Sequence, residues 1–321
     1  MRFTFGILCF NHEKYIIEHL ESIKYQVIKY RKKNKVDLIL IDDFSSDKTF
    51  ELAKLWLEKN KKIFKKITCK KNKKNLKTCK TYTKICRLIG TKKFKISASD
   101  DVYSYVNIFK ECISLKDFEF RSYKPILLYD SDLKIDLKLN FLIYICNAQY
   151  KSFYERVRGF PSLNTPNTLF SYNFIKKREV LNFINYFEIV EDWPFWLAIS
   201  KYFSVNFYQK HSTILYYRRT NNSAYLIKSN EFKEDKKKIL DNLIKFEKNK
   251  FKKILYRSRK KFYFSTFKII FDLNYILFVL VSFANFFPIL KKIFLEDYFL
   301  SRHQKHYDLI KHSAKNFKIQ V

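Results

Sequence analysis

The stretch KFKISASDDVY, residues 93–103, decides the fold that we expect for this chain. A short β-prone run over 94–98 is followed by two adjacent carboxylates, Asp100 and Asp101, and then by a helical pattern. In α/β sheets, ligands bind beyond the carboxyl ends of the strands. Two acids at that place repel each other unless a cation lies between them, and a divalent metal that bridges to phosphate is the commonest reason for such a pair. We therefore predict that Asp100 and Asp101 bind a metal at the edge of a sheet.

Strand and helix patterns alternate before this stretch. Apolar runs predict strands over 3–10, 37–41 and 65–69, and helical spacing predicts helices over 13–32, 50–56 and 79–88, with Gly90 placed to end the last helix. The second of these strands also ends in paired acids, Asp42 and Asp43. The order β-α-β-α-β-α-β predicts an α/β fold with a mostly parallel sheet flanked by helices.

The middle of the chain carries a second acid pair before a helix. Residues 125–145 read as strand-like, 159–168 as a loop, and 204–209 and 213–219 as late strands. Glu191 and Asp192 come directly before an apolar helix, where acids also stabilise the helix N-terminus. No G-x-G-x-x-G or Walker A sequence is present, so neither a dinucleotide fold nor a P-loop is supported.

The composition changes after Ser229, and we predict two regions, a first domain over 1–228 and a helical, basic extension over 229–321. Residues 233–261 follow a basic amphipathic helix pattern. Residues 273–290 contain no charged side chain and are flanked by basic ones. Three alternatives stay open for this segment: a membrane-spanning helix, a helix lying in the membrane interface, and an ordinary buried helix.

The charge of the chain predicts an anionic partner. Lys and Arg total 64 against 31 Asp and Glu among 321 residues, a formal charge of +33. Nucleic acid, an acidic membrane surface and phosphorylated small molecules all fit this charge, and so does a genome-level bias toward Lys, Asn, Ile, Phe and Tyr. The six cysteines lack zinc spacing and suggest reduced thiols. The N-terminus lacks a signal-peptide pattern, so we expect a cytoplasmic protein.

Four segments in this order resemble the motifs of family 2 glycosyltransferases of the GT-A fold: FTFGILCFNHEKYIIEHLESI, LILIDDFSSDKTFELA, ISASDDVY and EDWPFWLAIS. The resemblance covers residues 3–225. It implies an inverting transfer of a sugar from a nucleotide-sugar donor, assisted by a divalent metal, Mn²⁺ or Mg²⁺. Such a transfer needs a base for the acceptor hydroxyl and a Lewis acid for the departing diphosphate, and the acidic residues of these segments permit both.

The resemblance also implies roles for individual residues. Asp192 corresponds to the base, with Glu191 beside it at the mouth of the site, and Asp100 and then Asp101 are the metal ligands. The nucleotide-sugar would be bound by the following residues: Leu8, Cys9, Phe10, Asn11, Asp42, Asp43, Ser99, Arg218 and Arg219. Family members commonly carry D-x-D at the metal strand, whereas this chain has Ala98, Ser99 and Asp100, so the first aspartate is missing.

Three functions follow from these observations. The first is a glycosyltransferase, peripheral at the cytoplasmic face of an anionic membrane, that adds sugar to a glycan or lipid-linked acceptor in lipopolysaccharide or capsule synthesis. The second is a catalytically silent partner subunit with the same fold, which the missing aspartate suggests. The third is a nucleic-acid-binding protein that uses its charge and its 23 Tyr and 34 Phe for stacking, although no nucleic-acid-binding motif supports it.

Overall fold

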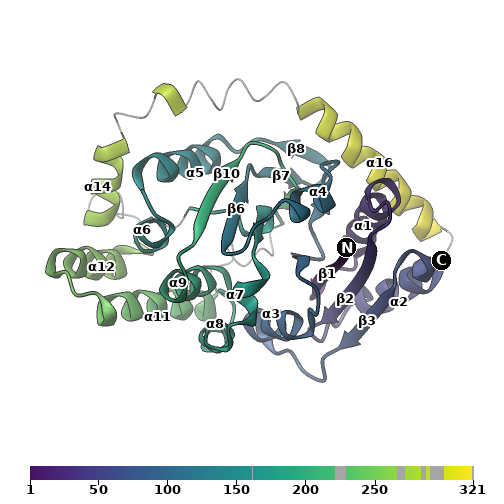
Figure 1. The fold of residues 1–321 in the computed structure, drawn as a ribbon, viewed down its shortest axis with the longest axis horizontal. Coiled ribbons are helices and arrows are strands. Elements are labelled where there is room, and N and C mark those ends of the chain that lie inside the picture. The colour runs from purple at the N-terminus through teal and green to yellow at the C-terminus, as the bar shows by residue number, and fades with distance from the viewer. Residues whose placement is uncertain (161, 221–228, 266–271, 283–286, 290–299, 320–321) are drawn as a thin grey trace.

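A parallel sheet lies at the centre of the N-terminal half of the chain (Figure 1). The computed structural model describes residues 1–321 except 161, 221–228, 266–271, 283–286, 290–299 and 320–321. The sheet has the order β3-β2-β1-β4 and every pair in it is parallel. Its strands are β1 (Arg2–Cys9), β2 (Lys35–Asp42), β3 (Lys66–Lys71) and β4 (Lys93–Ala98). The predicted α/β sheet is confirmed.

Helices cover both faces of this sheet, and most side chains of β1, β2 and β4 are buried beneath them. The helices are α1 (Ile16–Tyr30), α2 (Thr49–Asn60) and α3 (Lys77–Leu88), with a short 3-10 turn η1 (Lys61–Ile63) after α2. One core joins α1 and α2 to the sheet, and a second core joins α3 to its other face. Gly6 on β1 permits the approach of α3, since a Cβ at that position would lie 2.7 Å from Ile85.

Two smaller sheets follow β4 in the chain. One has the order β10-β6-β9 and the other β5-β11-β7-β8. Each mixes parallel and antiparallel pairs. Their strands are β5 (Val102–Tyr103), β6 (Glu119–Tyr123), β7 (Ile126–Tyr129), β8 (Asp132–Lys134), β9 (Thr168–Phe170), β10 (Asn206–Lys210) and β11 (Leu215–Arg218), with α4 (Ile108–Ile113) and η2 (Thr165–Asn167) between them. The two predicted late strands are therefore present as β10 and β11.

The expectation of a strand-like segment over 125–145 is wrong for its second half. The strands end with β8, and the helix α5 (Leu137–Gln149) follows. Asp136 begins this helix, because its carboxylate accepts the N–H of Leu139 at 2.8 Å. A short apolar run fits a buried helix as well as a strand, so periodicity alone did not separate them. Four helices then lead to the late strands: α6 (Phe153–Arg158), α7 (Tyr172–Lys176), α8 (Arg178–Ile184) and α9 (Asp192–Tyr202).

The helix predicted over 233–261 is divided into α11 (Asn230–Phe246) and α12 (Lys250–Phe262). Asn249 starts α12 by accepting the N–H of Lys252 at 3.1 Å. The uncharged segment begins with α14 (Leu273–Ser282), and residues 283–286 and 290 of it lie outside the described residues. Among the helices that the structure describes, none is long and apolar enough to cross a membrane.

The last helix, α16 (Leu300–Ile319), returns to the N-terminal half and packs along α1 (Figure 1). The helix agrees with the helical extension predicted after Ser229, whereas its packing along α1 was not predicted. His306 contacts the carbonyl of Tyr103 at 3.1 Å, and Tyr307 and Ile310 are buried beside β11. The residues after 229 therefore contact the same cores as the residues before it, at α11 through α9 and at α16 through α1.

Candidate active site

The predicted site residues of the first hundred positions meet at one edge of the parallel sheet. Cys9 ends β1 and lies opposite Asp42, which ends β2. On the other side of β1, Leu8 lies opposite Ala98, the last residue of β4. Because these strands are parallel, the loops that follow them share the carboxyl edge, where ligands of α/β sheets bind.

The loops after β1 and β2 are tied together by hydrogen bonds. The N–H of Asn11 donates to Ser45 Oγ at 2.9 Å, and Asn11 Oδ1 accepts the N–H of Ser46 at 2.9 Å. Asn11 and Phe44 adopt left-handed backbone conformations, with φ of 54° and 68°. Phe10 and Phe44 remain exposed beside them, at 41% and 50%. An exposed aromatic ring provides a face on which a nucleotide base stacks. The sequence prediction included Phe10 and missed Phe44.

Asp42 and Asp43 are both buried and both hold loops. The carboxylate of Asp42 accepts the N–H of Ser45 at 2.9 Å and its hydroxyl at 2.5 Å. Asp43 Oδ1 accepts from the Asn72 amide and from the N–H of Leu76, each at 2.8 Å. These bonds fix the loops around the sheet edge. Asn72 is a further residue of this edge that the sequence prediction did not include.

Asp100 faces a histidine that the sequence prediction also missed. His12 Nδ1 lies 2.8 Å from Ser99 Oγ, and His12 Nε2 lies 3.7 Å from Asp100 Oδ2. The Asp100 side chain is 16% exposed and that of His12 is 24% exposed. Ser99 is fixed in turn, because its N–H donates to the carbonyl of Leu8 at 2.9 Å. Asp100 therefore presents a carboxylate at the sheet edge, with an imidazole beside it.

Asp101 and Arg218 point inward. Asp101 is 1% exposed and accepts the N–H of Arg218 at 3.0 Å. Burial and the neighbouring charge of Asp100 raise the pKa of Asp101 well above its ordinary value. The Arg218 guanidinium donates to the carbonyl of Asp100 at 2.7 Å and pairs with Glu18 at 2.5 Å. Arg219 follows Arg218 in the chain, and the description of this segment ends at Thr220.

The acid pair at the start of α9 is held by its surroundings. Asp192 Oδ1 accepts the N–H of Trp193 at 2.6 Å, and Asp192 Oδ2 accepts the hydroxyl of Thr165 at 2.9 Å. Burial, together with the charge of Asp192, raises the pKa of Glu191 to about 8. A carboxyl group with a raised pKa is typical of sites that perform acid–base chemistry. Thr165 lies in a loop that carries no sequence motif, so it was not predicted.

Tyr217 on β11 is affected by the charges of two groups of acids, Asp100 with Asp101 and Asp192. Burial raises its pKa above the ordinary value, and the negative charges of Asp101, Asp100 and Asp192 add to this effect while Arg219 opposes it. A charge acts in this way only on a nearby group. The metal-strand acids and the predicted base therefore share one neighbourhood, although 91 residues separate Asp101 from Asp192 in the sequence.

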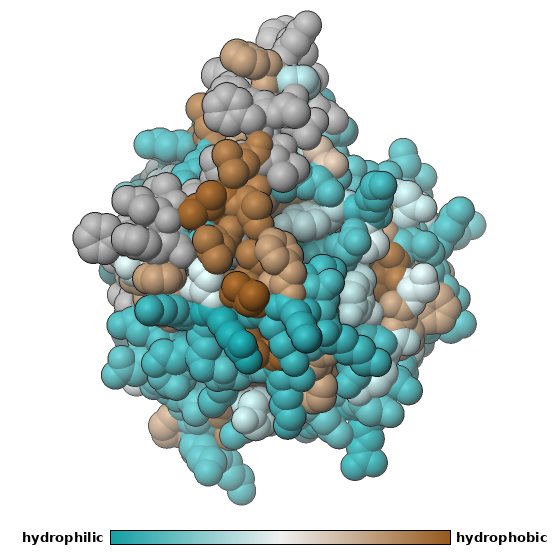
Figure 2. All heavy atoms as spheres, turned by 90° about the vertical axis from the view of Figure 1, so that its left-hand side faces the viewer, coloured by the Kyte–Doolittle hydropathy of each residue, from teal (hydrophilic) through white to brown (hydrophobic). Residues whose placement is uncertain are grey.

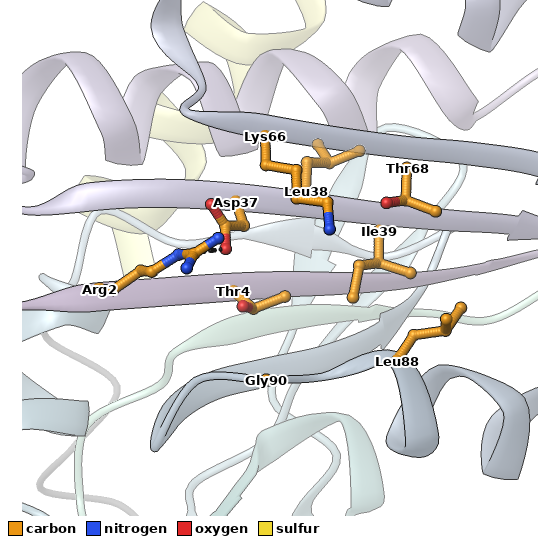
Figure 3. Close-up of a pocket in the computed structure, with 9 residues that line it drawn as sticks. All are labelled: Arg2, Thr4, Asp37, Leu38, Ile39, Lys66, Thr68, Leu88 and Gly90. Carbon is orange, nitrogen blue, oxygen red and sulfur yellow. Dashed lines mark hydrogen bonds and ion pairs between the residues drawn. The ribbon is translucent and has the colours of Figure 1, made fainter.

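A cavity of about 180 Å³ lies elsewhere on the same sheet (Figure 3). Its lining includes Arg2, Thr4 and Asp37 near the amino ends of β1 and β2, and Gly90 before β4. Arg2 pairs with Asp37 there at 2.7 Å. None of the predicted site residues lines this cavity, so we do not assign the chemistry to it.

The residues at the carboxyl edge suit a metal ion that is bound partly by the protein and partly by the phosphates of a nucleotide. Within the described residues, no group of three or more His, Cys, Asp or Glu is arranged to hold a metal ion. Mg²⁺ is usually bound through one or two carboxylates together with substrate phosphates and water. One accessible carboxylate, Asp100, fits that mode, whereas Asp101 is buried and engaged by Arg218.

The N-terminal segment of the chain matches a family model. Residues 4–81 match the family model described as Glycosyl transferase family 2. This segment contains β1 to β3, the loops after β1 and β2, and the residues Phe10, Asn11, Asp42 and Asp43. No curated protein has a matching sequence.

Solved structures share the fold at low sequence identity. S. aureus TarS 1-349 in complex with UDP-GlcNAc is 14% identical, with a TM-score of 0.55 over 98% of this chain and 92% of that chain. The longer S. aureus TarS structure has a TM-score of 0.53, and the match spans 55% of its chain. The mannosyltransferase PcManGT from Pyrobaculum calidifontis, in complex with GDP-Man and Mn²⁺, is 12% identical, with a TM-score of 0.52 over 96% of this chain and 86% of that chain. The fold is therefore that of GT-A glycosyltransferases, as predicted.

Proposed function

We propose that this protein is a glycosyltransferase that moves a sugar from a nucleotide-sugar donor to a glycan or lipid-linked acceptor. The observation that carries this proposal is the carboxyl edge of the parallel sheet, where Asp42 ends β2 and Asp100, just after β4, keeps a partly exposed carboxylate. The electrostatic effect of Asp100, Asp101 and Asp192 on Tyr217 supports the placing of Asp192 near this edge. The match of residues 4–81 and the fold shared with TarS and PcManGT support it. Those structures hold UDP-GlcNAc and GDP-Man, so uridine and guanosine donors are the first candidates here.

The reaction that fits these residues is an inverting, single displacement at the anomeric carbon. The acceptor oxygen forms a bond to that carbon while the bond from the carbon to the diphosphate breaks. Asp192 takes the proton of the acceptor hydroxyl, and the bonds from Thr165 and from the N–H of Trp193 fix its carboxylate in place. A protonated Glu191 avoids a second negative charge beside the base.

The leaving diphosphate carries the negative charge that develops in this step. A divalent metal, Mn²⁺ or Mg²⁺, would neutralise part of that charge when bound. Asp100 would hold it together with the phosphates of the donor. Phe10 and Phe44 offer ring faces to the base, and the guanidinium of Arg219, 5.3 Å from the ring centre of Tyr217, is proposed to meet a phosphate.

The acceptor, we propose, belongs to a surface glycan such as lipopolysaccharide or capsule, and α12 and α14 bring the enzyme to an anionic membrane. Figure 2 shows a band of apolar side chains bordered by hydrophilic ones on the face that carries α14. The exposed apolar residues of these helices are Phe251, Ile254, Leu273, Leu277 and Leu280. Basic side chains accompany them on α12, including Lys252, Lys253, Lys260 and Lys261. An apolar strip with a basic border is complementary to acidic lipid.

A screen of nucleotides tests the proposed activity. We expect UDP or GDP to raise the melting temperature, more strongly with Mn²⁺, and the matching nucleotide-sugar to release its diphosphate in the presence of the protein. A nucleotide that binds without any turnover of its sugar would instead favour the silent partner subunit. A melting temperature that no nucleoside diphosphate changes, with or without Mn²⁺, would contradict the proposal.

Sedimentation with vesicles tests the membrane surface. The wild-type protein should sediment with phosphatidylglycerol vesicles, less at high salt, and Leu280→Asp should weaken that binding. The matched control is Ile28→Asp, because Leu280 and Ile28 are exposed to the same degree, at 64% and 65%, on different helices. Equal sedimentation of the two variants would contradict the assignment of this face.

A further inference from the structure

Asp235 on α11 binds the segment that leads into the predicted base. Its Oδ2 accepts three consecutive backbone N–H groups, those of Glu188, Ile189 and Val190, at 2.9, 2.8 and 3.1 Å. The next two residues in the chain are Glu191 and Asp192. A single carboxylate oxygen therefore fixes the segment whose end carries the acid pair.

The acceptor of these three bonds is buried. Asp235 is 1% exposed, and its other oxygen, Oδ1, has no hydrogen-bond partner among the described residues. The closest cation to Oδ1 that the structure shows is the ammonium of Lys238, at 4.0 Å. Hydrogen bonds from N–H groups to an ionised acceptor are stronger than neutral ones, and buried N–H groups that lose their acceptor are costly. The segment thus depends on this one side chain for three of its donors.

A second contact holds the same segment. The carbonyl of Glu188 accepts the N–H of Cys79 on α3 at 2.9 Å. The 188–190 segment is therefore bound both by α3 and by α11. The start of α3 lies within the matched family segment, 4–81, whereas α11 lies far beyond that segment. Figure 1 shows α11 beside α9, and the two helices share one core.

We propose that Asp235 is a positioning residue for the transfer reaction, which holds the 188–190 segment so that Asp192 meets the acceptor hydroxyl. This inference rests on the proposed function. A displacement of about 1 Å of a catalytic group can cost on the order of 100-fold in rate. The region after 229 would then have a role in the chemistry and not only at the membrane.

The test compares Asp235→Asn with Asp241→Asn in the full-length protein. Asp241 lies on the same helix, and its side chain is 56% exposed. The assay is the release of UDP from UDP-GlcNAc or of GDP from GDP-mannose, whichever the wild-type protein turns over. We expect Asp235→Asn to lower kcat by about 10- to 100-fold and to speed amide hydrogen exchange at 188–190. KM for the donor and the binding of the free nucleotide should stay at the wild-type values, and Asp241→Asn should behave as wild type.

A purely structural role would lower the melting temperature and leave kcat of the folded protein unchanged, and that result would overturn the inference. Should Asp235→Asn fail to fold, Asp235→Glu keeps the charge and displaces the segment by one methylene, with the same expected loss of kcat. Wild-type kcat in the folded variant would again overturn the inference while the proposed function stands. A wild-type protein that turns over no nucleotide-sugar contradicts the proposed function itself, and the inference with it.

Discussion

The guanidinium of Arg218 lies 2.5 Å from the carboxylate of Glu18, with side chains that are 2% and 14% exposed. The same Glu18 oxygen accepts the hydroxyl of Tyr307 from α16 at 3.1 Å. Because Arg218 also binds the carbonyl of Asp100, it connects α1 and α16 to the loop of the metal strand. Arg218 is thus engaged inside the protein, and its predicted role as a phosphate ligand would require it to leave these partners.

Removal of Arg218 should therefore affect stability first. Arg218→Ala leaves Glu18 without its partner in a largely buried place, which typically costs about 3–5 kcal/mol in the free energy of unfolding. The double variant Glu18→Ala/Arg218→Ala should lose less than the sum of the two single variants, since the unpaired charge is absent. Urea unfolding of the three variants measures both. Additive losses would show that the pair is not coupled.

Asp192→Asn should abolish transfer while nucleotide binding persists. The amide cannot take the proton of the acceptor, and a positioned base contributes about 10²- to 10⁴-fold to the rate. Thr165 and the N–H of Trp193 can still bind the amide side chain, so we expect little change in the fold. Initial rates of nucleotide release, with Asp117→Asn as the exposed control, check this expectation. Near wild-type turnover would refute the assignment of Asp192 as the base.

Metal dependence should separate Asp100 from its neighbour. Asp100→Ala should remove the increase in UDP or GDP affinity that Mn²⁺ produces, because Asp100 is the accessible carboxylate at the sheet edge. Asp101→Asn should retain that increase, since Asp101 is buried and its raised pKa favours a neutral group. Calorimetric titration with and without Mn²⁺ distinguishes the two variants. An unchanged Mn²⁺ effect in Asp100→Ala would mean that the cation binds elsewhere.

The central sheet could be predicted from the sequence because the patterns that indicate its strands lie within the strands themselves. β1 and β2 contain short apolar runs, and the acids that close β2 and follow β4 mark the carboxyl edge. The same logic failed over 137–145, where a helix capped by Asp136 carries an apolar run without clear periodicity. It also gave no sign of where α16 packs, because the burial of this helix against α1 depends on a contact between the two ends of the chain.

The candidate site was predictable where its residues end a strand or begin a helix. Asp42, Asp100 and Asp192 all lie at such positions. His12 and Thr165 could not be found, because each acts through a contact with a residue far away in the sequence, Ser99 and Asp192. Asp235 is hidden for the same reason, since its three donors lie more than forty residues earlier. The proposed first domain over 1–228 stays a prediction.

The raised pKa of Glu191 makes a prediction about stability and pH. Its pKa rises from 4.5 to about 8 in the folded protein. Between these values the unfolded chain has lost the proton that the folded protein keeps, so the contribution of Glu191 to stability falls as the pH rises. The variant Glu191→Gln cannot ionise at this position, so it lacks this loss of stability. The free energy of unfolding of the variant, relative to that of the wild type, should therefore increase from pH 5 to pH 8 by up to about 1.4 kcal/mol per pH unit. Denaturant unfolding across this range provides the measurement, and a difference that does not change with pH would contradict it.

The histidines of α16 predict the opposite dependence in acid. Burial lowers the pKa of His303 and of His306 from 6.5 to about 4. His303 faces the hydroxyl of Tyr216 at 2.9 Å, with Lys124 and Arg302 nearby, and His306 faces the carbonyl of Tyr103. Both side chains must therefore stay neutral in the folded protein.

A depressed pKa of this kind contributes stability that is fully present above pH 6.5 and is lost as the pH falls toward 4. Each histidine should contribute up to about 1.4 kcal/mol per pH unit to this loss. The variant His303→Gln/His306→Gln cannot take up these protons, so its stability should depend less on pH between 4 and 6.5 than that of the wild type. His312→Gln on the exposed side of the same helix is the matched control and should keep the wild-type dependence. Unfolding in urea at several pH values measures the slopes, and equal slopes for the double variant and the control would show that α16 does not hold these histidines neutral.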